Sequence, residues 1–152
     1  MLVNHGNSVI SKYGLEDLVS YELPGGIEKR ILGKCRLSIS GTEVNFFVAH
    51  LSLSKMARIR QLLEISHIVK KSERPFILAG DFNTSDKSEI ESFAKSLGNG
   101  VQYQSHDTYP TWRPNKPLDY IFLSKDFELV RSYTSKEKLS DHLPLIYEVK
   151  LK

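Results

Sequence analysis

Residues 76–83 read F-I-L-A-G-D-F-N, in which an apolar, strand-like run leads directly into polar side chains. Four apolar residues in a row at 76–79, with Pro75 before them, are typical of a short buried strand. Asp81 and Asn83 follow where that strand ends. Loops held by a rigid sheet carry many binding and catalytic groups, so these two residues are candidates for a functional site.

Three further strand-like runs carry polar residues at one end. The run V-N-F-F-V-A at 44–49 leads into His50 and is apolar on both faces, which favours a central strand covered on both sides. Asp119 begins the run D-Y-I-F-L, and S-D-H at 140–142 precedes the run L-P-L-I-Y. If the last two strands run antiparallel to the first two, all four polar groups gather at one edge of the sheet.

The residue types in such a site limit its chemistry. Carboxylates with an asparagine oxygen are hard ligands that suit Mg²⁺ or Mn²⁺. A histidine beside an aspartate is a base or a cation whose tautomer is fixed by its partner. The sequence has no G-x-S-x-G motif and no thiol to accompany the histidines, so water is the favoured nucleophile. Together these residue types indicate hydrolysis of a phosphate ester.

Each motif also has a purely structural interpretation. A single histidine such as His50 at a strand end is more often structural or solvated. G-D-F-N is a good turn sequence because Asp and Asn both favour turns, and S-D-H is compatible with a capped turn. The coincidence of all four motifs at strand ends favours a site over these alternatives.

The rest of the chain alternates short strands with two helices and has no internal repeat or linker, so we expect one domain over residues 1–152, of class α/β or α+β. The apolar periodicity of 54–71 predicts a helix that begins after Ser54. A second helix is expected at 86–97, capped by Ser85 or Asp86. Further strands are expected at 8–11, 19–23, 27–39, 43–49, 119–123, 127–133 and 143–151, with a turn at 24–26 and a hairpin turn at 40–42.

Composition and charge exclude several classes of protein. The chain has 152 residues, 21 basic and 18 acidic side chains and a net charge of +3, which is typical of a globular protein and not of a strong non-specific nucleic-acid binder. Cys35 is the single cysteine, which excludes an intrachain disulfide and leaves a cysteine zinc cluster without support. The sequence shows neither a transmembrane segment nor a signal peptide, so we expect a cytoplasmic protein.

At these motifs the sequence resembles the endonuclease/exonuclease/phosphatase superfamily, the metal-dependent phosphohydrolases related to pancreatic deoxyribonuclease. The matching segments follow the family's order, and G-D-F-N together with S-D-H is highly specific. The resemblance implies a two-sheet, four-layer α/β sandwich. The matching segments are G-N-S-V-I-S at 6–11, A-H-L-S at 49–52, R-x-x-Q at 58–61, L-A-G-D-F-N at 78–83, T-Y-P-T-W-R-P at 108–114, P-L-D-Y-I-F-L-S at 117–124 and S-D-H-L-P-L at 140–145.

The resemblance also implies catalytic roles. Asp81 would orient or deprotonate the attacking water, and Asn83 would contact the scissile phosphate. His142, oriented by Asp119, would stabilise the phosphate or exchange a proton with it. His50 would contact the phosphate or protonate the leaving group.

A Mg²⁺ or Mn²⁺ ion held by Asp81, Asn83 and Asp141 is implied in the same way. The family's main metal ligand is a glutamate upstream of the segment that matches residues 6–11, and the glutamates that follow that segment in this chain do not match it. We therefore expect an N-terminally truncated domain with a weaker metal affinity. Loss of part of one sheet would expose an apolar face and unpaired strand edges, so we expect self-association or pairing with a separate N-terminal segment.

Trp112 and Arg113 are the candidates for substrate contact. They lie on the loop before Asp119, where an aromatic ring is able to stack on a base or meet a lipid, and a guanidinium is able to bind phosphate. The alternative for Trp112 is a buried ring that anchors its own loop.

Two functions are therefore in competition. The first is a metal-dependent phosphoesterase that hydrolyses a phosphodiester or phosphomonoester by in-line attack of activated water. Its substrate is left open between nucleic acid, a phospholipid headgroup and an inositol phosphate. The second is a non-catalytic fragment of the same fold that acts as a binding or interaction module, because the metal-binding glutamate is absent.

Overall fold

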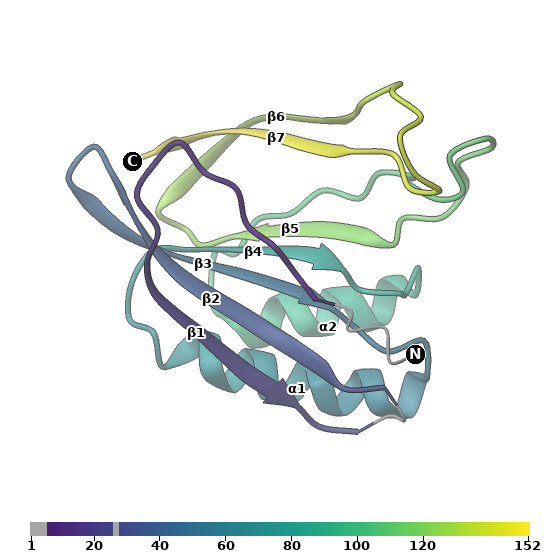
Figure 1. The fold of residues 1–152 in the computed structure, drawn as a ribbon, viewed down its shortest axis with the longest axis horizontal. Coiled ribbons are helices and arrows are strands. Elements are labelled where there is room, and N and C mark those ends of the chain that lie inside the picture. The colour runs from purple at the N-terminus through teal and green to yellow at the C-terminus, as the bar shows by residue number, and fades with distance from the viewer. Residues whose placement is uncertain (1–5, 26–27) are drawn as a thin grey trace.

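The computed structural model describes residues 6–25 and 28–152, which form two β-sheets and two helices (Figure 1). Five strands form the larger sheet, and two form the smaller one. The elements in chain order are β1 (Glu16–Leu23), β2 (Arg30–Ile39), β3 (Thr42–His50), α1 (Lys55–Lys70), β4 (Phe76–Asp81), α2 (Lys87–Leu97), β5 (Asp119–Leu123), β6 (Phe127–Thr134) and β7 (Leu145–Leu151).

The larger sheet has the strand order β1-β2-β3-β4-β5. β3 and β4 run parallel, and α1 connects them, because parallel neighbours need a long crossover. The other neighbouring pairs are antiparallel, and β2 turns directly into β3. In that turn Ser40 and Gly41 have φ angles of 51° and 82°, the left-handed pair that a two-residue hairpin favours. The predicted hairpin is therefore confirmed.

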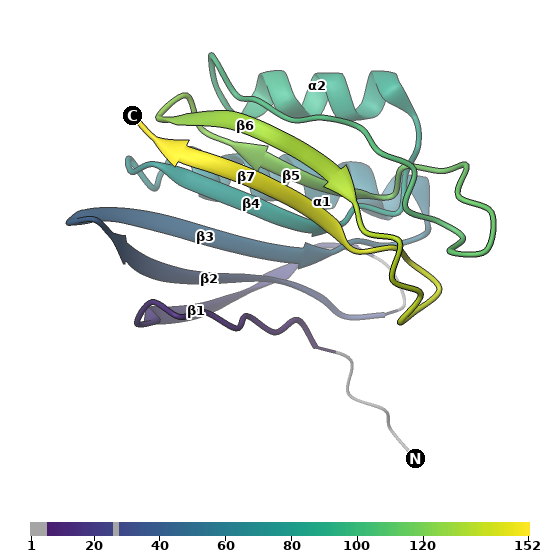
Figure 2. The ribbon, with the colours of Figure 1, turned by 90° about the horizontal axis from the view of Figure 1, so that it is seen from above.

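The two faces of the larger sheet are covered by different layers. α1 and α2 pack on one face, and the β6–β7 sheet lies over the β4–β5 side of the other face, as Figure 2 shows from above. Successive residues of β5 face opposite ways, so Phe122 packs with the helices while Leu123 packs with Phe127 of β6. The predicted α/β fold with two sheets is confirmed. Of the four expected layers, the described part of the chain contains a helix layer, the larger sheet and the smaller sheet.

The two helices begin close to where the sequence places them. α1 has Ser54 as its N-cap residue, without a side-chain cap hydrogen bond. α2 has Asp86 as its N-cap, and the Asp86 carboxylate accepts hydrogen bonds from the backbone N–H groups of Ser88 and Glu89. Asp86, rather than Ser85, is thus the cap. Neither helix is long and apolar enough to cross a membrane.

Some expectations at strand ends were wrong. Residues 8–11 form no strand, and Ile10 in that segment is 98% exposed. Just before this segment, the Asn7 amide donates to the carbonyls of Ile31 on β2 and Val48 on β3. The last strand begins at Leu145, two residues later than predicted. The turn at 24–26 and the start of the strand at 27–39 lie partly outside the described residues.

Candidate active site

Three of the expected site residues lie side by side at one edge of the larger sheet. His50 pairs in register with Asp81 across β3 and β4, and Asp81 pairs with Asp119 across β4 and β5. The carboxyl ends of two parallel strands meet the amino end of an antiparallel third strand there. The prediction that these polar groups gather at one sheet edge is confirmed for this trio.

The S-D-H motif reaches the same place from a different element. It lies in the segment before β7, which belongs to the smaller sheet, so the expectation of a fourth strand in the same sheet was wrong. His142 Nδ1 lies 2.7 Å from Asp119 Oδ2. His142 Nε2 lies 3.9 Å from Asp81 Oδ2, and His50 Nε2 lies 3.5 Å from the same oxygen. The site is therefore built across the two sheets, with the Asp81 carboxylate between two imidazoles.

The loop after β4 is held by a buried aromatic ring and a local turn. Phe82 is fully buried and packs against Phe93 and Phe122 at ring-centroid distances of 5.7 Å and 5.2 Å. The Asn83 backbone N–H donates to Asp81 Oδ1 at 2.9 Å, and its amide donates to the carbonyl of Leu51 at 2.8 Å. Asn83 has a φ of 51°, a conformation that asparagine tolerates. Phe82 thus anchors the loop while its two neighbours face the site.

Gly80 lets the two parallel strands approach closely just before the site. Its φ is 153°, and a Cβ at this position would lie 1.9 Å from the carbonyl oxygen of Ala49. A larger residue would push β3 and β4 apart where His50 and Asp81 pair. The glycine of G-D-F-N is therefore required by packing.

Buried polar residues of α1 hold the segment that follows His50. Gln61 is fully buried, and its side-chain oxygen accepts a hydrogen bond from the Ser52 backbone N–H at 2.9 Å. Arg58 is 6% exposed, pairs with Glu89 at 2.6 Å and donates to the carbonyls of Ser52 and Leu53. The R-x-x-Q segment thus has a structural role in this protein.

The site opens into a cleft with a volume of about 680 Å³. It contains five of the expected residues and also charged residues that the sequence did not single out, notably Arg30. No local pattern marks Arg30; the antiparallel register of β2 on β3, in which Leu32 pairs with Ala49, brings the start of β2 to the end of β3 that carries His50. The cleft is lined by Glu28, Arg30, His50, Leu53, Asp81, Asn83, Thr84, Ser85, Tyr109, Lys116, Leu118, Asp141 and His142.

Burial and neighbouring charges separate the two histidines. Burial lowers the pKa of His50 and outweighs the opposing Asp81 charge. Burial acts on His142 in the same direction, but the hydrogen bond to Asp119 and the charges of Asp119 and Asp81 outweigh it, so the pKa of His142 is raised. Burial also raises the pKa of Asp81, against the hydrogen bond from Asn83. The two histidines are thus shifted in opposite directions, with the neutral form favoured at His50 and the cationic form favoured at His142.

The donor set fits a divalent cation. Ligand atoms of Asp81, Asp119 and His142 lie within 4.8 Å of one another, and the carboxylate of Asp81 is largely withdrawn from water. A cation beside Asp81 would stabilise its charged form against that burial. Asp141, an expected ligand, lines the cleft but is not part of this close cluster; it is exposed and accepts a hydrogen bond from Ser140 Oγ at 3.0 Å.

The loop that carries Trp112 is fastened to the segment before His142. The Thr111 N–H donates to the Asp141 carbonyl at 2.8 Å, and the Tyr109 ring lies 4.9 Å from the His142 ring. Trp112 is 70% exposed and packs edgewise on Tyr109, so the alternative of a buried anchoring ring was wrong. Trp112 and Arg113 do not line the cleft itself, so their contact with substrate stays a prediction.

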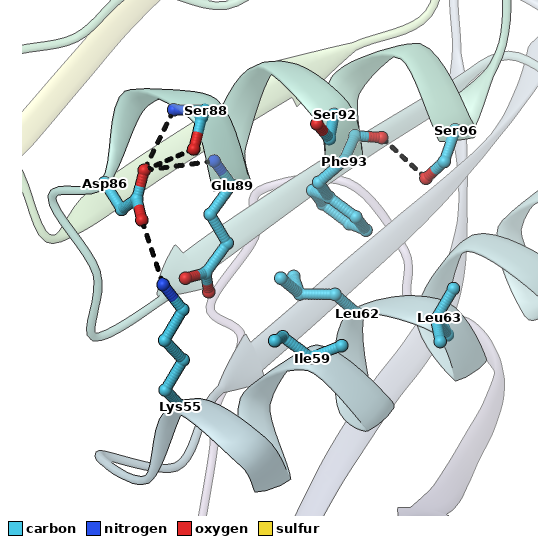
Figure 3. Close-up of a pocket in the computed structure, with 10 residues that line it drawn as sticks. All are labelled: Lys55, Ile59, Leu62, Leu63, Asp86, Ser88, Glu89, Ser92, Phe93 and Ser96. Atoms are coloured by element: carbon cyan, nitrogen blue, oxygen red, sulfur yellow. Dashed lines mark hydrogen bonds and ion pairs between the residues drawn. The ribbon is translucent and has the colours of Figure 1, made fainter.

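A second hollow of about 310 Å³ lies between α1 and α2 (Figure 3). Leu62 and Phe93 form apolar walls, and the Asp86 carboxylate at one end pairs with Lys55 at 3.3 Å. The other carboxylate in the hollow belongs to Glu89, which is bound by Arg58. Both acids thus have structural partners, and the lining of the hollow does not include a histidine.

Comparison with known proteins gives a family and a fold. Residues 3–142 match the model of the Endonuclease/Exonuclease/phosphatase family. A curated relative, UPF0294 protein YE0917 of Yersinia enterocolitica, is 29% identical over 109 residues, which are 69% of this chain and 41% of that protein. The matched residues therefore cover well under half the length of this relative.

Similar solved structures come from several organisms. A mannosyl-6-phosphatase of Bacteroides thetaiotaomicron has a TM-score of 0.73 at 18% identity, over 92% of this chain and 68% of its own. TDP2 of D. rerio, complexed with a single-strand DNA product, has a TM-score of 0.75 at 20% identity, over 90% and 68%. The human Nocturnin catalytic domain has a TM-score of 0.70 at 21% identity, over 92% and 60%. At these identities the likeness is one of fold.

Proposed function

Because the chain belongs to the endonuclease/exonuclease/phosphatase family, we propose that it is a metal-dependent phosphoesterase. The observation that carries the proposal is the position of Asp81 between His50 and His142, with Asp119 bound to the far side of His142. Solved structures of the same fold include a phosphatase and a complex with a DNA product, which supports a phosphate ester as the substrate.

Asp81 and His142 have different roles in the proposed hydrolysis. Asp81, whose pKa is raised by burial, is suited to accept a proton from the attacking water. The Nδ1–H of His142 donates to Asp119, which fixes the ring so that Nε2 faces the cleft. A cationic His142 then donates its Nε2–H to a phosphate oxygen and stabilises the charge that develops there.

His50 and Asn83 complete the arrangement. His50 lies on the side of Asp81 opposite β5 and is suited to contact the phosphate or the leaving oxygen. Asn83 lines the cleft on the loop that Phe82 anchors, and it is suited to contact the scissile phosphate. A Mg²⁺ or Mn²⁺ ion would be held at the Asp81 carboxylate, with Asn83 and Asp141, which line the same cleft, as the other expected ligands; when bound, the ion supplies Lewis-acid stabilisation of the phosphate charge.

The proposal is tested by turnover of bis-p-nitrophenyl phosphate with and without Mg²⁺. We expect Mg²⁺-dependent release of p-nitrophenol by the wild-type chain, and a loss of about 100-fold or more in Asp81→Asn. Asp86→Asn is the matched control, because it makes the same substitution at a helix cap outside the cleft. Equal rates in the three proteins would contradict the proposal.

One observation favours a second function, that of a binding module without catalysis. Among the described residues, the close cluster at Asp81 contains no glutamate. Glu28 lines the cleft, but its carboxylate is paired with Arg30. Saturable binding of inorganic phosphate without turnover at any Mg²⁺ concentration would select this alternative.

A further inference from the structure

The outer side of α1 carries apolar side chains that the core does not use. Four of the eleven large apolar side chains that are exposed in residues 6–25 and 28–152 lie within 53–63. Leu53 lies just before α1, and Met56, Ile59 and Leu63 follow at spacings of three and four residues, so these three share one side of the helix. The opposite side faces the core, where Ile65 is fully buried. We call Leu53, Met56, Ile59 and Leu63 the α1 ridge.

The α1 ridge protrudes into solvent. Leu53 is 78% exposed, Met56 is 67% exposed and Leu63 is 64% exposed. Ile59 is less exposed because it also lines the hollow between α1 and α2. Single exposed apolar residues are ordinary, whereas apolar residues that gather in one patch mark an interaction surface. The α1 ridge is therefore a candidate for docking.

Basic side chains surround the α1 ridge. Within α1 and α2, five exposed residues are basic and one is acidic. Two other acids of these helices, Glu64 and Glu89, are only partly exposed, and Glu89 is bound by Arg58. A surface with this charge attracts a negatively charged partner. The exposed basic residues are Lys55, Arg60, Lys70, Lys87 and Lys95, and the exposed acid is Glu91.

The shape of the helix layer distinguishes a lipid surface from an acidic peptide helix. A peptide helix docks in an apolar groove, but the α2 wall of the hollow beside the ridge includes the serines Ser88, Ser92 and Ser96 (Figure 3). The hollow has a volume of about 310 Å³, which is less than the roughly 500 Å³ that one helical turn with its side chains fills. A bilayer needs no groove, because protruding apolar side chains enter it directly.

The charges also disfavour a second copy of this chain as the partner. Two copies that meet through their α1 ridges would bring the basic side chains of both helix layers together. Like charges that face one another across an interface weaken it. Anionic headgroups instead neutralise these side chains, so a lipid surface satisfies both the apolar ridge and its basic surroundings.

We propose that the outer side of the helix layer docks on an anionic lipid bilayer, with the α1 ridge inserted at the boundary between headgroups and acyl chains. Arg60 and Lys70 would contact the anionic headgroups beside it. Leu53 also lines the cleft, so docking places one wall of the cleft at the bilayer surface. Docking requires no hydrolysis, and its test is therefore separate from that of the proposed function.

Co-sedimentation with sucrose-loaded vesicles tests the docking. One set of vesicles contains phosphatidylcholine alone, and the other an equimolar mixture of phosphatidylcholine and phosphatidylglycerol. We expect the wild-type protein to bind the anionic vesicles about tenfold more tightly, and high salt to weaken that preference. Met56→Ser combined with Leu63→Ser should lower binding to anionic vesicles about tenfold. Val130→Ser is the control, because Val130 is 49% exposed but lies on β6, in the smaller sheet.

Charge variants test the basic part of the surface. Arg60→Gln combined with Lys70→Gln should remove most of the preference for anionic vesicles. Lys136→Gln combined with Lys150→Gln makes the same change in net charge at exposed positions outside both helices, and it should leave the preference unchanged. Circular dichroism checks the fold of every variant, all of which alter exposed side chains.

Tryptophan fluorescence identifies the face that meets the lipid. Trp112 is the single tryptophan and lies on the loop between α2 and β5, so its emission should stay unchanged when anionic vesicles are added. In a Trp112→Phe background, Leu63→Trp should shift its emission to shorter wavelength on the same vesicles. Val130→Trp in that background should not shift.

Three results would overturn the proposal. The first is a folded wild-type protein that binds neither kind of vesicle, which would favour an acidic protein partner for the ridge. The second is vesicle binding that is unchanged when Met56 and Leu63 are both replaced by Ser. The third is a shift in Trp112 emission without one in Leu63→Trp, which would assign lipid contact to the Trp112 loop.

Discussion

His142 Nδ1 lies 2.7 Å from Asp119 Oδ2, although the two residues are attached to different sheets. Asp119 begins β5 of the larger sheet, and His142 lies in the segment before β7 of the smaller one. This contact brings the last conspicuous motif of the sequence to the edge where His50 and Asp81 pair. The packing of one sheet on the other therefore sets the geometry of the candidate site.

Asp119→Asn tests the role of this contact. The hydrogen bond to Asp119 and its charge both raise the pKa of His142, so the pKa of His142 should fall in the variant. We expect phosphoesterase activity to drop by about 100-fold or more, because the cationic form and the ring orientation are both lost. NMR titration of the histidine signals measures the shift, and an unchanged His142 pKa would contradict this role.

Gly80→Ala tests the close approach of β3 and β4. The added methyl group meets the Ala49 carbonyl oxygen, so we expect a loss of about 1–3 kcal/mol or more in the free energy of unfolding. Gly14→Ala is the control, since a Cβ there has no atom within 4 Å. Urea denaturation measures both variants. Equal free energies of unfolding for the two variants would contradict the steric role of Gly80.

The cap of α2 predicts a pH dependence of stability. Hydrogen bonds from Ser88, then from Lys55 and Glu89, lower the pKa of Asp86 from 3.8 to about 2. A lowered pKa in the folded state means that the charged form stabilises the fold above pH 3.8, and that this contribution is lost as the pH falls toward about 2. Asp86→Asn keeps a capping group but cannot ionise.

The stability advantage of the wild type over Asp86→Asn should therefore be constant near neutral pH and shrink in strong acid. Urea midpoints of both proteins across this range give the comparison. If the stability advantage of the wild type over Asp86→Asn instead grew as the pH fell, the electrostatic role of the Asp86 carboxylate would be refuted.

The exposed apolar side chains predict self-association. Leu18 on β1, an edge strand of the larger sheet, is 74% exposed, and Ile10 is 98% exposed. Unpaired strand edges beside apolar groups favour pairing with a second chain. We propose that sedimentation equilibrium will give a mass that rises above 17.4 kDa with concentration. Leu18→Lys should weaken the association more than Leu63→Lys on α1. A stable wild-type monomer at all concentrations would contradict the predicted self-association.

Local sequence patterns predicted most of the elements and the edge at which the site lies. The runs that end at His50 and Asp81 carry their own strand signals, and Asp86 caps its helix through contacts within one turn. The sheet to which the S-D-H motif belongs was not predictable in the same way. It depends on the pairing of β6 with β7 and on the packing of Leu123 against Phe127.

Arg30 was not predicted as a cleft residue, for a related reason. Nothing in the local pattern of residues 28–30 distinguishes a cleft residue from a solvated basic residue at the start of a strand. Its place in the site follows from the register of β2 on β3, which places it beside the segment after His50. The exposure of Trp112 likewise follows from how its loop is fastened to Asp141, a contact that the loop sequence does not encode alone.

Mg²⁺-dependent hydrolysis of bis-p-nitrophenyl phosphate by wild-type, His142→Ala and His106→Ala proteins tests the proposed chemistry most directly. His106 is the matched histidine, since it lies outside the cleft and bonds to Ser132 Oγ at 2.7 Å. We predict that His106→Ala retains wild-type turnover while His142→Ala loses about 100-fold or more. Equal turnover in all three proteins would contradict a catalytic site built on Asp119, His142 and Asp81.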